Sequence, residues 1–464
     1  MEQTYDITII GAGPGGYVAA VRSAQLGLKV ALVEKEHLGG VCLNWGCIPT
    51  KALLRNAEVI SLLGRGKYFG FTVTGFEADY GAAVDRSRKV SGRLVKGIGV
   101  LMRKNGVEVI AGHGALKSPR AVEVALNEGG TRTLQTRNIV VATGGRARTI
   151  PGITPDGERV LTYREAIVLR EVPQSVVIVG AGPIGMEFAH VWHTYGAEVT
   201  VVEMLPHALP LEDEEVSAEV ERALKRRRVR LLTSTRVQGV ETAAGGVRVS
   251  VAGDQGEQVL EAERVLVAIG ARPNSENLGL AEIGVRVERG CVVVDGHLCT
   301  DVPGIYSIGD VTGKLPLAHV ASAQGIIVAE TIAGVETVTL DYEMMPRCTY
   351  CHPQVASFGL TEARAVERNH QVKVGKFAFR ANGKALGLGD YDGFVKIVAD
   401  ATSGEILGAH MVGPEVTELL PELVLAHNWE LTPDEIARSV HAHPTLSEAL
   451  MEAAHAVFGK AIHV

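Results

Sequence analysis

Two cysteines near the N-terminus have a spacing that suits redox chemistry. Cys42 and Cys47 lie in the string GGVCLNWGCIPTK, which precedes a helical stretch, ALLRNAEVISLL. Four intervening residues let the two thiols pair across a distorted helical turn, and the unpaired N–H groups of a helix N-terminus lower the pKa of a thiol there. The spacing matches neither a CxxC redox motif nor a zinc pattern, so two buried structural thiols remain the alternative.

A histidine near the C-terminus lies in a sequence that can orient a general base. His443 precedes Pro444, and Glu448 follows five residues after the histidine. A carboxylate that accepts a hydrogen bond from an imidazole fixes the ring, and dithiol chemistry requires a base near neutral pH. The alternative interpretation is a structural His-Pro turn before a helix.

The elements that must position these side chains include two copies of one βαβ pattern. Residues 5–10 and 175–179 read as buried strands, each followed by a glycine loop, a helical stretch and a second strand that ends in a glutamate, Glu34 or Glu203. Each glutamate follows the first glycine by 23 residues (34 − 11 and 203 − 180). The loop residues that we expect to contact a dinucleotide are Gly11, Gly13, Pro14, Gly15, Gly16, Gly180, Gly182 and Gly185.

Such loops bind pyrophosphate because glycine permits a tight turn, close backbone approach and close packing of helix on strand. The helix N-terminus faces the anion, and the terminal glutamate accepts hydrogen bonds from ribose hydroxyls. Two such sites on one chain indicate a flavin and a nicotinamide that exchange electrons. The segment after Glu203, EMLPHALPLEDEE, offers only His207 as a cation and continues into an acidic run, so NAD is favoured over NADP.

Composition excludes several classes of function. The chain has 46 Lys and Arg against 53 Asp and Glu, a formal charge of −7, without long blocks of one sign, so we expect no nucleic-acid or membrane partner. The apolar runs are shorter than the roughly 20 residues that cross a bilayer. The N-terminus shows no export or import signal and six cysteines are too few for a secreted disulfide scaffold, so a cytoplasmic location is expected.

The quoted cysteine and histidine strings, the two glycine loops and GIYSIGD (304–310) together resemble the pyridine nucleotide-disulfide oxidoreductases over essentially all 464 residues. The cysteine and histidine strings are specific to the disulfide reductase branch of that family. The resemblance implies an α/β fold with two Rossmann-like dinucleotide-binding domains plus a C-terminal α+β dimerisation domain. The implied division is an FAD-binding domain (1–148), an NAD-binding domain (149–272), a central segment that completes the FAD site (273–342) and an interface domain (343–464).

The resemblance also implies roles for individual residues. FAD binds the first loop and Glu34, and NAD binds the second loop and Glu203. Lys51 lies near the flavin and pairs with Glu187. His443 and Glu448 complete the active site of the other subunit in a homodimer. Further residues expected at the cofactors are Gly40, Thr143, Gly144, Gly270, Asp310, Ala318 and His319, although for His319 a structural role at a helix start is an equal alternative.

The implied reaction is oxidation of dihydrolipoamide to lipoamide with reduction of NAD+ to NADH, through FAD and a Cys42–Cys47 disulfide. Implied partners are the lipoyl domains and core acyltransferase of 2-oxoacid dehydrogenase complexes, or the H-protein of glycine cleavage. The rival hypotheses are a glutathione reductase, which the acidic run disfavours, a mercuric reductase, which would need a vicinal cysteine pair where this chain ends KAIHV, and a scaffold subunit of a multienzyme core.

Some positions depart from the family pattern or resist assignment. Val41, Trp45 and Thr50 replace the Thr, Val and Ser that relatives usually carry around the cysteines, and Trp45 is large enough to alter the approach of a disulfide. Cys348 and Cys351 belong to a CxxCH string that matches covalent haem attachment, but two buried residues in a sheet is the simpler interpretation, and we expect no metal.

Overall fold

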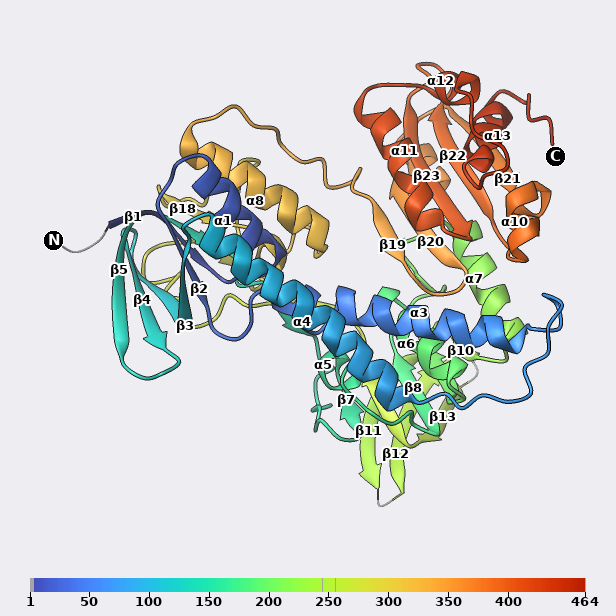
Figure 1. The fold of residues 1–464 in the computed structure, drawn as a ribbon, viewed down its shortest axis with the longest axis horizontal. Coiled ribbons are helices and arrows are strands. Elements are labelled where there is room, and N and C mark those ends of the chain that lie inside the picture. The colour runs from blue at the N-terminus through green and yellow to red at the C-terminus, as the bar shows by residue number, and fades with distance from the viewer. Residues whose placement is uncertain (1–3, 244, 255, 464) are drawn as a thin grey trace.

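The first of three large sheets forms the N-terminal part of the molecule (Figure 1). The computed structural model describes residues 4–243, 245–254 and 256–463. Parallel strands run in the order β3-β2-β1-β5-β18, and β3 and β5 extend further to pair antiparallel with β4. The strands are β1 (Thr4–Ile10), β2 (Val30–Glu34), β3 (Glu108–Ser118), β4 (Ala121–Leu126), β5 (Thr131–Val141) and β18 (Ile305–Ser307). Because β18 belongs to the segment 273–342, that segment completes the first sheet.

Helices cover this sheet and lead away from it towards the rest of the chain. They are α1 (Pro14–Gln25), α2 (Gly40–Asn44), α3 (Cys47–Gly64), α4 (Tyr80–Lys104), the 3₁₀ helix η1 (Gly309–Thr312) and α8 (Ala318–Ala333). Helices α1 and α8 lie side by side (Figure 1), and a Cβ on Gly325 would lie only 2.5 Å from the carbonyl oxygen of Gly15. Close contact between these helices therefore depends on glycine.

The second sheet is all parallel, in the order β10-β9-β8-β14-β7. A meander, β11-β12-β13, packs beside it. The elements of this region are β7 (Val160–Leu161), α5 (Tyr163–Ala166), β8 (Ser175–Val179), α6 (Pro183–Thr194), β9 (Glu198–Val202), α7 (Glu214–Arg226), β10 (Arg230–Leu232), β11 (Arg236–Ala243), β12 (Gly246–Gly253), β13 (Gly256–Ala262) and β14 (Arg264–Val267). Buried apolar runs such as SVVIV form these strands because helices and the meander cover both faces of the sheet.

Two short strands join the first and second regions. β6 (Gly145–Ala147) and β15 (Ala271–Pro273) pair antiparallel, with Ala147 opposite Ala271. They lie close to the domain boundaries that the resemblance implies, at 148 and 272. A smaller hairpin follows, made of β16 (Val287–Glu288) and β17 (Cys291–Val292).

The C-terminal third forms an antiparallel sheet, β19-β20-β23-β22-β21, with helices packed on it. The elements are β19 (Arg347–Thr349), β20 (Gln354–Gly359), α9 (Glu362–Glu367), β21 (Val372–Ala378), η2 (Phe379–Ala381), α10 (Gly383–Leu388), β22 (Phe394–Asp400), β23 (Ile406–Gly413), α11 (Val416–Asn428), α12 (Pro433–Arg438) and α13 (Glu448–Val457). The predicted α/β class with a C-terminal α+β domain is confirmed. No helix within the described ranges is both long and apolar enough to span a bilayer.

Candidate active site

The two thiols lie where one short helix ends and a long one begins. Cys42 belongs to α2, and Cys47 is the first residue of α3, after a break at Trp45 and Gly46. The thiols hydrogen-bond to each other. That bond, assisted by burial, raises the pKa of Cys42, whereas for Cys47 it lowers the pKa below the ordinary 9.0. The expected lowering of a thiol pKa at the helix N-terminus agrees with Cys47, the first residue of α3, whereas contact with Cys47 and burial raise the pKa of Cys42.

An ion pair between the half-buried Lys51 and the buried Glu187 lies one helical turn beyond Cys47. The Lys51 ammonium donates to both carboxylate oxygens of Glu187, at 2.8 and 3.0 Å, and lies 4.5 Å from the centroid of the Tyr350 ring. Glu187, 4% exposed on α6, also accepts a 3.0 Å hydrogen bond from the Tyr350 N–H. The charge of Lys51 lowers the pKa of Cys47, and the charge of Glu187 raises it. This pair connects the thiol helix to the helix of the second glycine loop.

Each glycine loop is closed by a contact that excludes any side chain. A Cβ on Gly16 would lie 1.9 Å from the carbonyl oxygen of Gly11, and one on Gly185 would lie 2.0 Å from that of Gly180. Gly11 and Gly180 have φ of +103° and +104°, a backbone conformation that favours glycine. Both predicted loops therefore need glycine to form the turn and to pack the helix against the strand.

The middle glycines serve a different purpose. Gly13 and Gly182 are the N-caps of α1 and α6, with Pro14 and Pro183 at the first helical position, where proline is favoured. A Cβ on either glycine would meet no atom within 4 Å. Glycine is not needed there by the fold itself, so the open space in front of each helix N-terminus fits a pyrophosphate group.

The two glutamates at the strand ends hold their loops in the same way. Glu34 accepts hydrogen bonds from the N–H groups of Ala12 (2.7 Å) and Glu36 (2.8 Å). Glu203 makes the equivalent bonds, of 2.8 and 2.9 Å, to residues 169 positions later in each case. Each carboxylate is therefore fixed beside its loop, in the position that a ribose would approach.

Other predicted cofactor residues surround the first loop or the paired strands β6 and β15. Gly40 has φ of +57°, and a Cβ there would lie 2.7 Å from the Cα of Gly13. The Thr143 hydroxyl donates to the Asn274 carbonyl at 2.7 Å. Burial raises the pKa of Asp310, which lies in η1. Gly144 and Gly270 also have positive φ and flank the paired strands.

His319 follows Ala318 in the first turn of α8, and its ring Nε2 hydrogen-bonds to the Pro346 carbonyl at 2.8 Å. This bond joins the start of α8 to the segment that enters the C-terminal domain. It gives His319 the structural contact that the sequence left as an alternative.

His443 and Glu448 form a histidine–carboxylate pair on the C-terminal domain. The His443 Nδ1 lies 2.8 Å from a Glu448 oxygen, and the other Glu448 oxygen accepts from the Thr445 N–H at 2.8 Å. Burial opposes ionisation of Glu448, but these two hydrogen bonds lower its pKa. The His443 side chain is 77% exposed, and Figure 1 shows α13 far from the start of α3. Within one chain, the structure does not bring this pair to the thiols.

Two arginines that the sequence did not single out enclose Trp45. The guanidinium groups of Arg88 and Arg164 lie 5.1 and 4.5 Å from the centroid of its ring. Arg88 also donates to the Asn44 carbonyl, and Arg164 pairs with Glu36. Cation–π pairs join residues far apart in sequence, so no local pattern could have revealed them.

The acidic run after Glu203 has partners other than a nucleotide. Asp213 and Glu215 both bind Lys396 of the C-terminal domain. A basic side chain also reaches this region from elsewhere, since the Arg236 guanidinium lies 4.0 Å from the sulfur of Met204, next to Glu203. The sequence argument for NAD therefore depends on Glu203 itself rather than on the acidic run.

Cys348 and Cys351, the cysteines of the CxxCH string, lie in and beside the C-terminal sheet. Cys351 is 4% exposed and its thiol donates to the Pro353 carbonyl at 3.1 Å. Burial raises the pKa of Cys348 to about 11 and that of Cys351 to about 12. Among the described residues, no group of three or more His, Cys, Asp or Glu side chains is arranged to hold a metal ion. Cys351 is therefore buried beside the sheet, as expected, whereas Cys348, on β19, is only half-buried.

Two dinucleotide loops joined by a thiol helix and the Lys51–Glu187 ion pair define a disulfide oxidoreductase that uses two dinucleotides. Residues 5–325 match the pyridine nucleotide-disulphide oxidoreductase family, and residues 345–454 match the dimerisation domain of that family. The chain belongs to this family.

Named relatives match the sequence of this chain over almost its whole length. Dihydrolipoyl dehydrogenase of Mycobacterium tuberculosis is 52% identical over 99% of both chains, and that of Zymomonas mobilis is 47% identical over all of both. Among solved structures, LpdA from Mycobacterium tuberculosis superposes with a TM-score of 0.91 at 29% identity, covering 97% of this chain and 98% of its own. RclA, a flavoprotein disulfide reductase from Escherichia coli, gives 0.87 at 26% identity, covering 97% and 99%.

Proposed function

We infer that this chain is an enzyme that oxidises dihydrolipoamide to lipoamide, with FAD and NAD+ as cofactors, through a redox-active disulfide. The observation that carries this inference is the thiol pair at the start of α3, linked by Lys51 and Glu187 to the helix of the second glycine loop. Full-length identity of 45–52% to dihydrolipoyl dehydrogenases supports the substrate.

We propose that the first loop and Glu34 bind FAD and that the second loop and Glu203 bind NAD. The closed turns and the open space at Gly13 and Gly182 support this assignment, since both loops fit a pyrophosphate. Asp310, in buried surroundings beside the first sheet, completes the FAD site. The corresponding division of the chain is 1–148 for FAD, 149–272 for NAD, 273–342 for the segment that completes the FAD site and 343–464 for the interface.

In the proposed reaction, His443 of the partner subunit, oriented by Glu448, takes a proton from one thiol of dihydrolipoamide. The resulting thiolate attacks the sulfur of Cys42, the Cys42–Cys47 bond breaks, and Cys47 leaves as a thiolate. The second substrate thiol, once deprotonated, attacks the substrate sulfur of the mixed disulfide, which releases lipoamide and leaves Cys42 reduced.

The surroundings of Cys47 suit a leaving thiolate. The positive charge of Lys51 lowers the pKa of Cys47 and stabilises its anion as it leaves, and once lipoamide has departed the reduced Cys42 thiol can also donate a hydrogen bond to it. FAD, when bound, accepts the electron pair from the dithiol and supplies it to NAD+. Cys42, whose pKa is raised, remains the protonated member that donates to Cys47.

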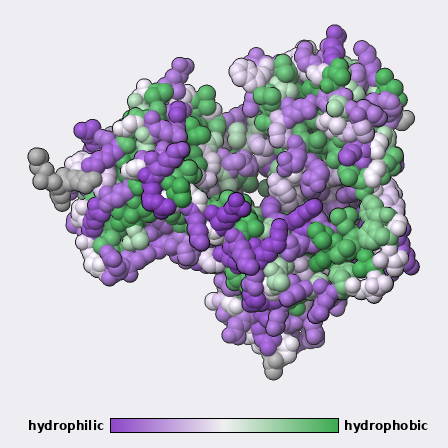
Figure 2. Space-filling view, viewed as in Figure 1, coloured by the Kyte–Doolittle hydropathy of each residue, from purple (hydrophilic) through white to green (hydrophobic). Residues whose placement is uncertain are grey.

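The match to the dimerisation domain supports a homodimer. The exposed base His443, in the segment that precedes α13, is incomplete without a second chain, because the thiols of its own chain lie elsewhere. Figure 2 also shows hydrophobic surface over the C-terminal half of α3 and the segment that follows it. Exposed apolar side chains in this part include Leu62, Tyr68, Phe69 and Phe71. Contiguous apolar surface of this kind indicates a protein interface.

We further propose that the lipoyl groups it oxidises belong to a 2-oxoacid dehydrogenase or glycine cleavage complex. A cytoplasmic location is part of this proposal, since a compartment that keeps thiols reduced suits the four cysteines outside the Cys42–Cys47 pair.

An anaerobic assay of the purified protein tests the function directly. With dihydrolipoamide as the reductant, we expect rapid formation of NADH from NAD+ and little NADPH from NADP+. A yellow, FAD-loaded protein that reduces neither nucleotide would contradict the proposed substrate while leaving the family intact.

A further inference from the structure

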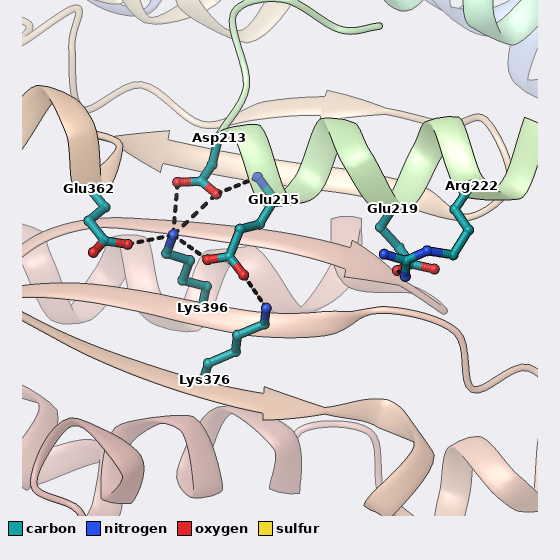
Figure 3. Close-up of polar contacts among 7 residues, drawn as sticks. All are labelled: Asp213, Glu215, Glu219, Arg222, Glu362, Lys376 and Lys396. Atoms are coloured by element: carbon teal, nitrogen blue, oxygen red, sulfur yellow. Dashed lines mark hydrogen bonds and ion pairs between the residues drawn. The ribbon is translucent and has the colours of Figure 1, made fainter. Parts of the chain in front are cut away.

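A lysine of the C-terminal sheet is buried among three carboxylates. Lys396, on β22, is 2% exposed, and its ammonium lies 3.1 Å from Asp213, 2.8 Å from Glu215 and 2.8 Å from Glu362 (Figure 3). Burial alone would lower its pKa, but the three carboxylates raise it. A buried ammonium is stable only when negative groups compensate its charge, so the three carboxylates must stay beside Lys396 in the folded protein.

Two of the three carboxylates belong to the region that carries the second glycine loop. Asp213 is the N-cap of α7 and accepts from the Glu215 N–H at 3.1 Å, while Glu362 lies on α9 of the C-terminal domain. Glu215 also pairs with Lys376 on β21 (Figure 3). The N-terminus of α7 is therefore bound to the C-terminal sheet by both lysines.

The other end and the apolar face of α7 are attached to the same domain. Arg226, in its last turn, pairs with Asp392 at 2.7 Å. Val216 and Val220 of α7 are buried in a cluster that includes Phe394 of β22 and Val412 of β23. Helix α7 thus lies fixed against the C-terminal sheet along its length.

The same helix holds the segment that supports the second glycine loop. The Ser217 hydroxyl donates to the Leu209 carbonyl at 3.3 Å, and Glu221 accepts from the Ala208 N–H at 2.9 Å. Leu209 in turn donates its N–H to the carbonyl of Ala181 at 2.9 Å. Ala181 is the residue between the first two glycines of the loop, and its N–H donates to Glu203.

A continuous series of hydrogen bonds and ion pairs therefore runs from Lys396, through α7 and residues 208–209, to the loop at 180–182. We propose that Lys396 is a positioning residue for the second dinucleotide site: by fixing α7 to the C-terminal domain, it holds the glycine loop in the geometry that binds the nicotinamide dinucleotide. This inference rests on the proposed assignment of NAD to that loop.

Two carboxylates provide a matched test. Glu215 and Glu362 each lie 2.8 Å from the Lys396 ammonium, and their side chains are 46% and 47% exposed, but only Glu215 belongs to α7. In the oxidised, FAD-loaded dimer, titration calorimetry with NAD+ measures the dissociation constant. We expect Glu215→Gln, which loses the partly exposed pairs with both Lys396 and Lys376, to raise it about fivefold, and Glu362→Gln, which loses only the pair with Lys396, to leave it within about twofold of the unmodified protein.

Lys396→Met removes all three pairs and should raise the dissociation constant for NAD+ by at least about tenfold. The rate at which dihydrolipoamide reduces the flavin, followed anaerobically without NAD+, should stay unchanged in all three variants, because the thiols and the first loop are not attached to α7. A general loss of stability would change both the dissociation constant for NAD+ and the rate of flavin reduction, whereas the proposal expects a change in the dissociation constant alone.

Equal weakening of NAD+ binding by Glu215→Gln and Glu362→Gln, or no weakening by either, would overturn the proposal. Should Lys396→Met fail to fold, the two glutamine variants still decide the question. Failure of the unmodified protein to oxidise dihydrolipoamide would count against the proposed function alone, since the comparison of NAD+ affinities does not depend on that substrate.

Discussion

The pKa of Cys42 is raised and that of Cys47 is lowered, although the two residues are only five positions apart. Their mutual hydrogen bond makes Cys42 the donor and Cys47 the anion, and Lys51 adds a nearby positive charge. A thiol with a lowered pKa is the better leaving group in disulfide exchange. The proposed attack at Cys42 with departure of Cys47 agrees with the positive charge of Lys51 beside Cys47.

Replacing Cys47 by serine should lower the turnover of dihydrolipoamide with NAD+ by at least about 10³-fold, because no disulfide can form. The visible absorbance of bound FAD should remain, since the side chain is not needed for the first glycine loop. Assay of activity and of FAD content in the same sample checks this, and full activity in Cys47→Ser would disprove the thiol relay.

The pKa of Cys47 should move in opposite directions in two variants of the Lys51–Glu187 ion pair. Lys51→Met removes a positive charge and raises this pKa, whereas Glu187→Gln removes a negative charge and lowers it. In the reduced protein, alkylation by iodoacetamide accelerates as pH rises through this pKa, which lies below 9.0 in the unmodified protein. The midpoint should shift to higher pH in Lys51→Met and to lower pH in Glu187→Gln. Shifts of the same sign would contradict the assigned electrostatics.

The sequence was enough to name the residues of this site, but not to predict the difference in pKa between the two thiols or the contacts of Trp45. The spacing of Cys42 and Cys47 left both a redox pair and two structural thiols open, and the resemblance implied the redox role together with Lys51 and Glu187. The difference in acidity depends on contact between the two sulfurs, and the enclosure of Trp45 depends on Arg88 and Arg164 from other helices. Contacts of this kind between distant parts of the chain are set by packing and leave no periodic signal.

At the scale of elements, the two βαβ units are the features that sequence predicted best. Their strands, glycine loops and terminal glutamates repeat with one spacing, because each must form the same turn, helix start and carboxylate position. The pairing of β6 with β15 and the meander β11–β13 are set by tertiary contacts. Only turn residues mark these segments in the sequence, so the partners of their strands were not predictable.

Alanine at the middle glycines should separate the two cofactors. Because a Cβ at Gly13 or Gly182 meets open space, both variants should fold with little change in stability. In Gly182→Ala the methyl group occupies the room of a pyrophosphate, so the dissociation constant for NAD+ should rise by about tenfold or more while FAD content stays constant. Gly13→Ala should instead lose FAD. Loss of FAD from Gly182→Ala would contradict the assignment of loops to cofactors.

At the scale of the whole molecule, one chain holds the thiols and the base on separate domains. His443 is exposed on the C-terminal domain, and Cys42 lies at the junction of α2 and α3. In the homodimer that we propose, the active site is complete only between two chains. The resemblance supplied this arrangement, whereas the attachment of α7 through Lys396 was not foreseen, because a lysine within the strand FVKIVAD reads as a solvent-facing residue.

Mixed dimers test the shared site. Cys42→Ser and His443→Gln homodimers should each be inactive or nearly so. Co-refolding equal amounts should restore about a quarter of the unmodified activity, because half of the dimers are mixed and each has one intact site. The measurement is NADH formation after random exchange of subunits. No recovery in dimers shown to be mixed would place base and disulfide on the same chain.

The antiparallel pair β6–β15 has a consequence for how such a protein can be rebuilt. The chain enters the region of the second sheet just after Ala147 and leaves it just before Ala271, and these two residues lie opposite each other. Neighbouring strands place such residues about 5 Å apart. That region is thus a cassette with adjoining ends, which a short linker can replace. If the remaining domains do not need the contacts of α6 and α7, a protein without this region should remain a flavoprotein that dihydrolipoamide reduces. If they need these contacts, that reduction should be lost.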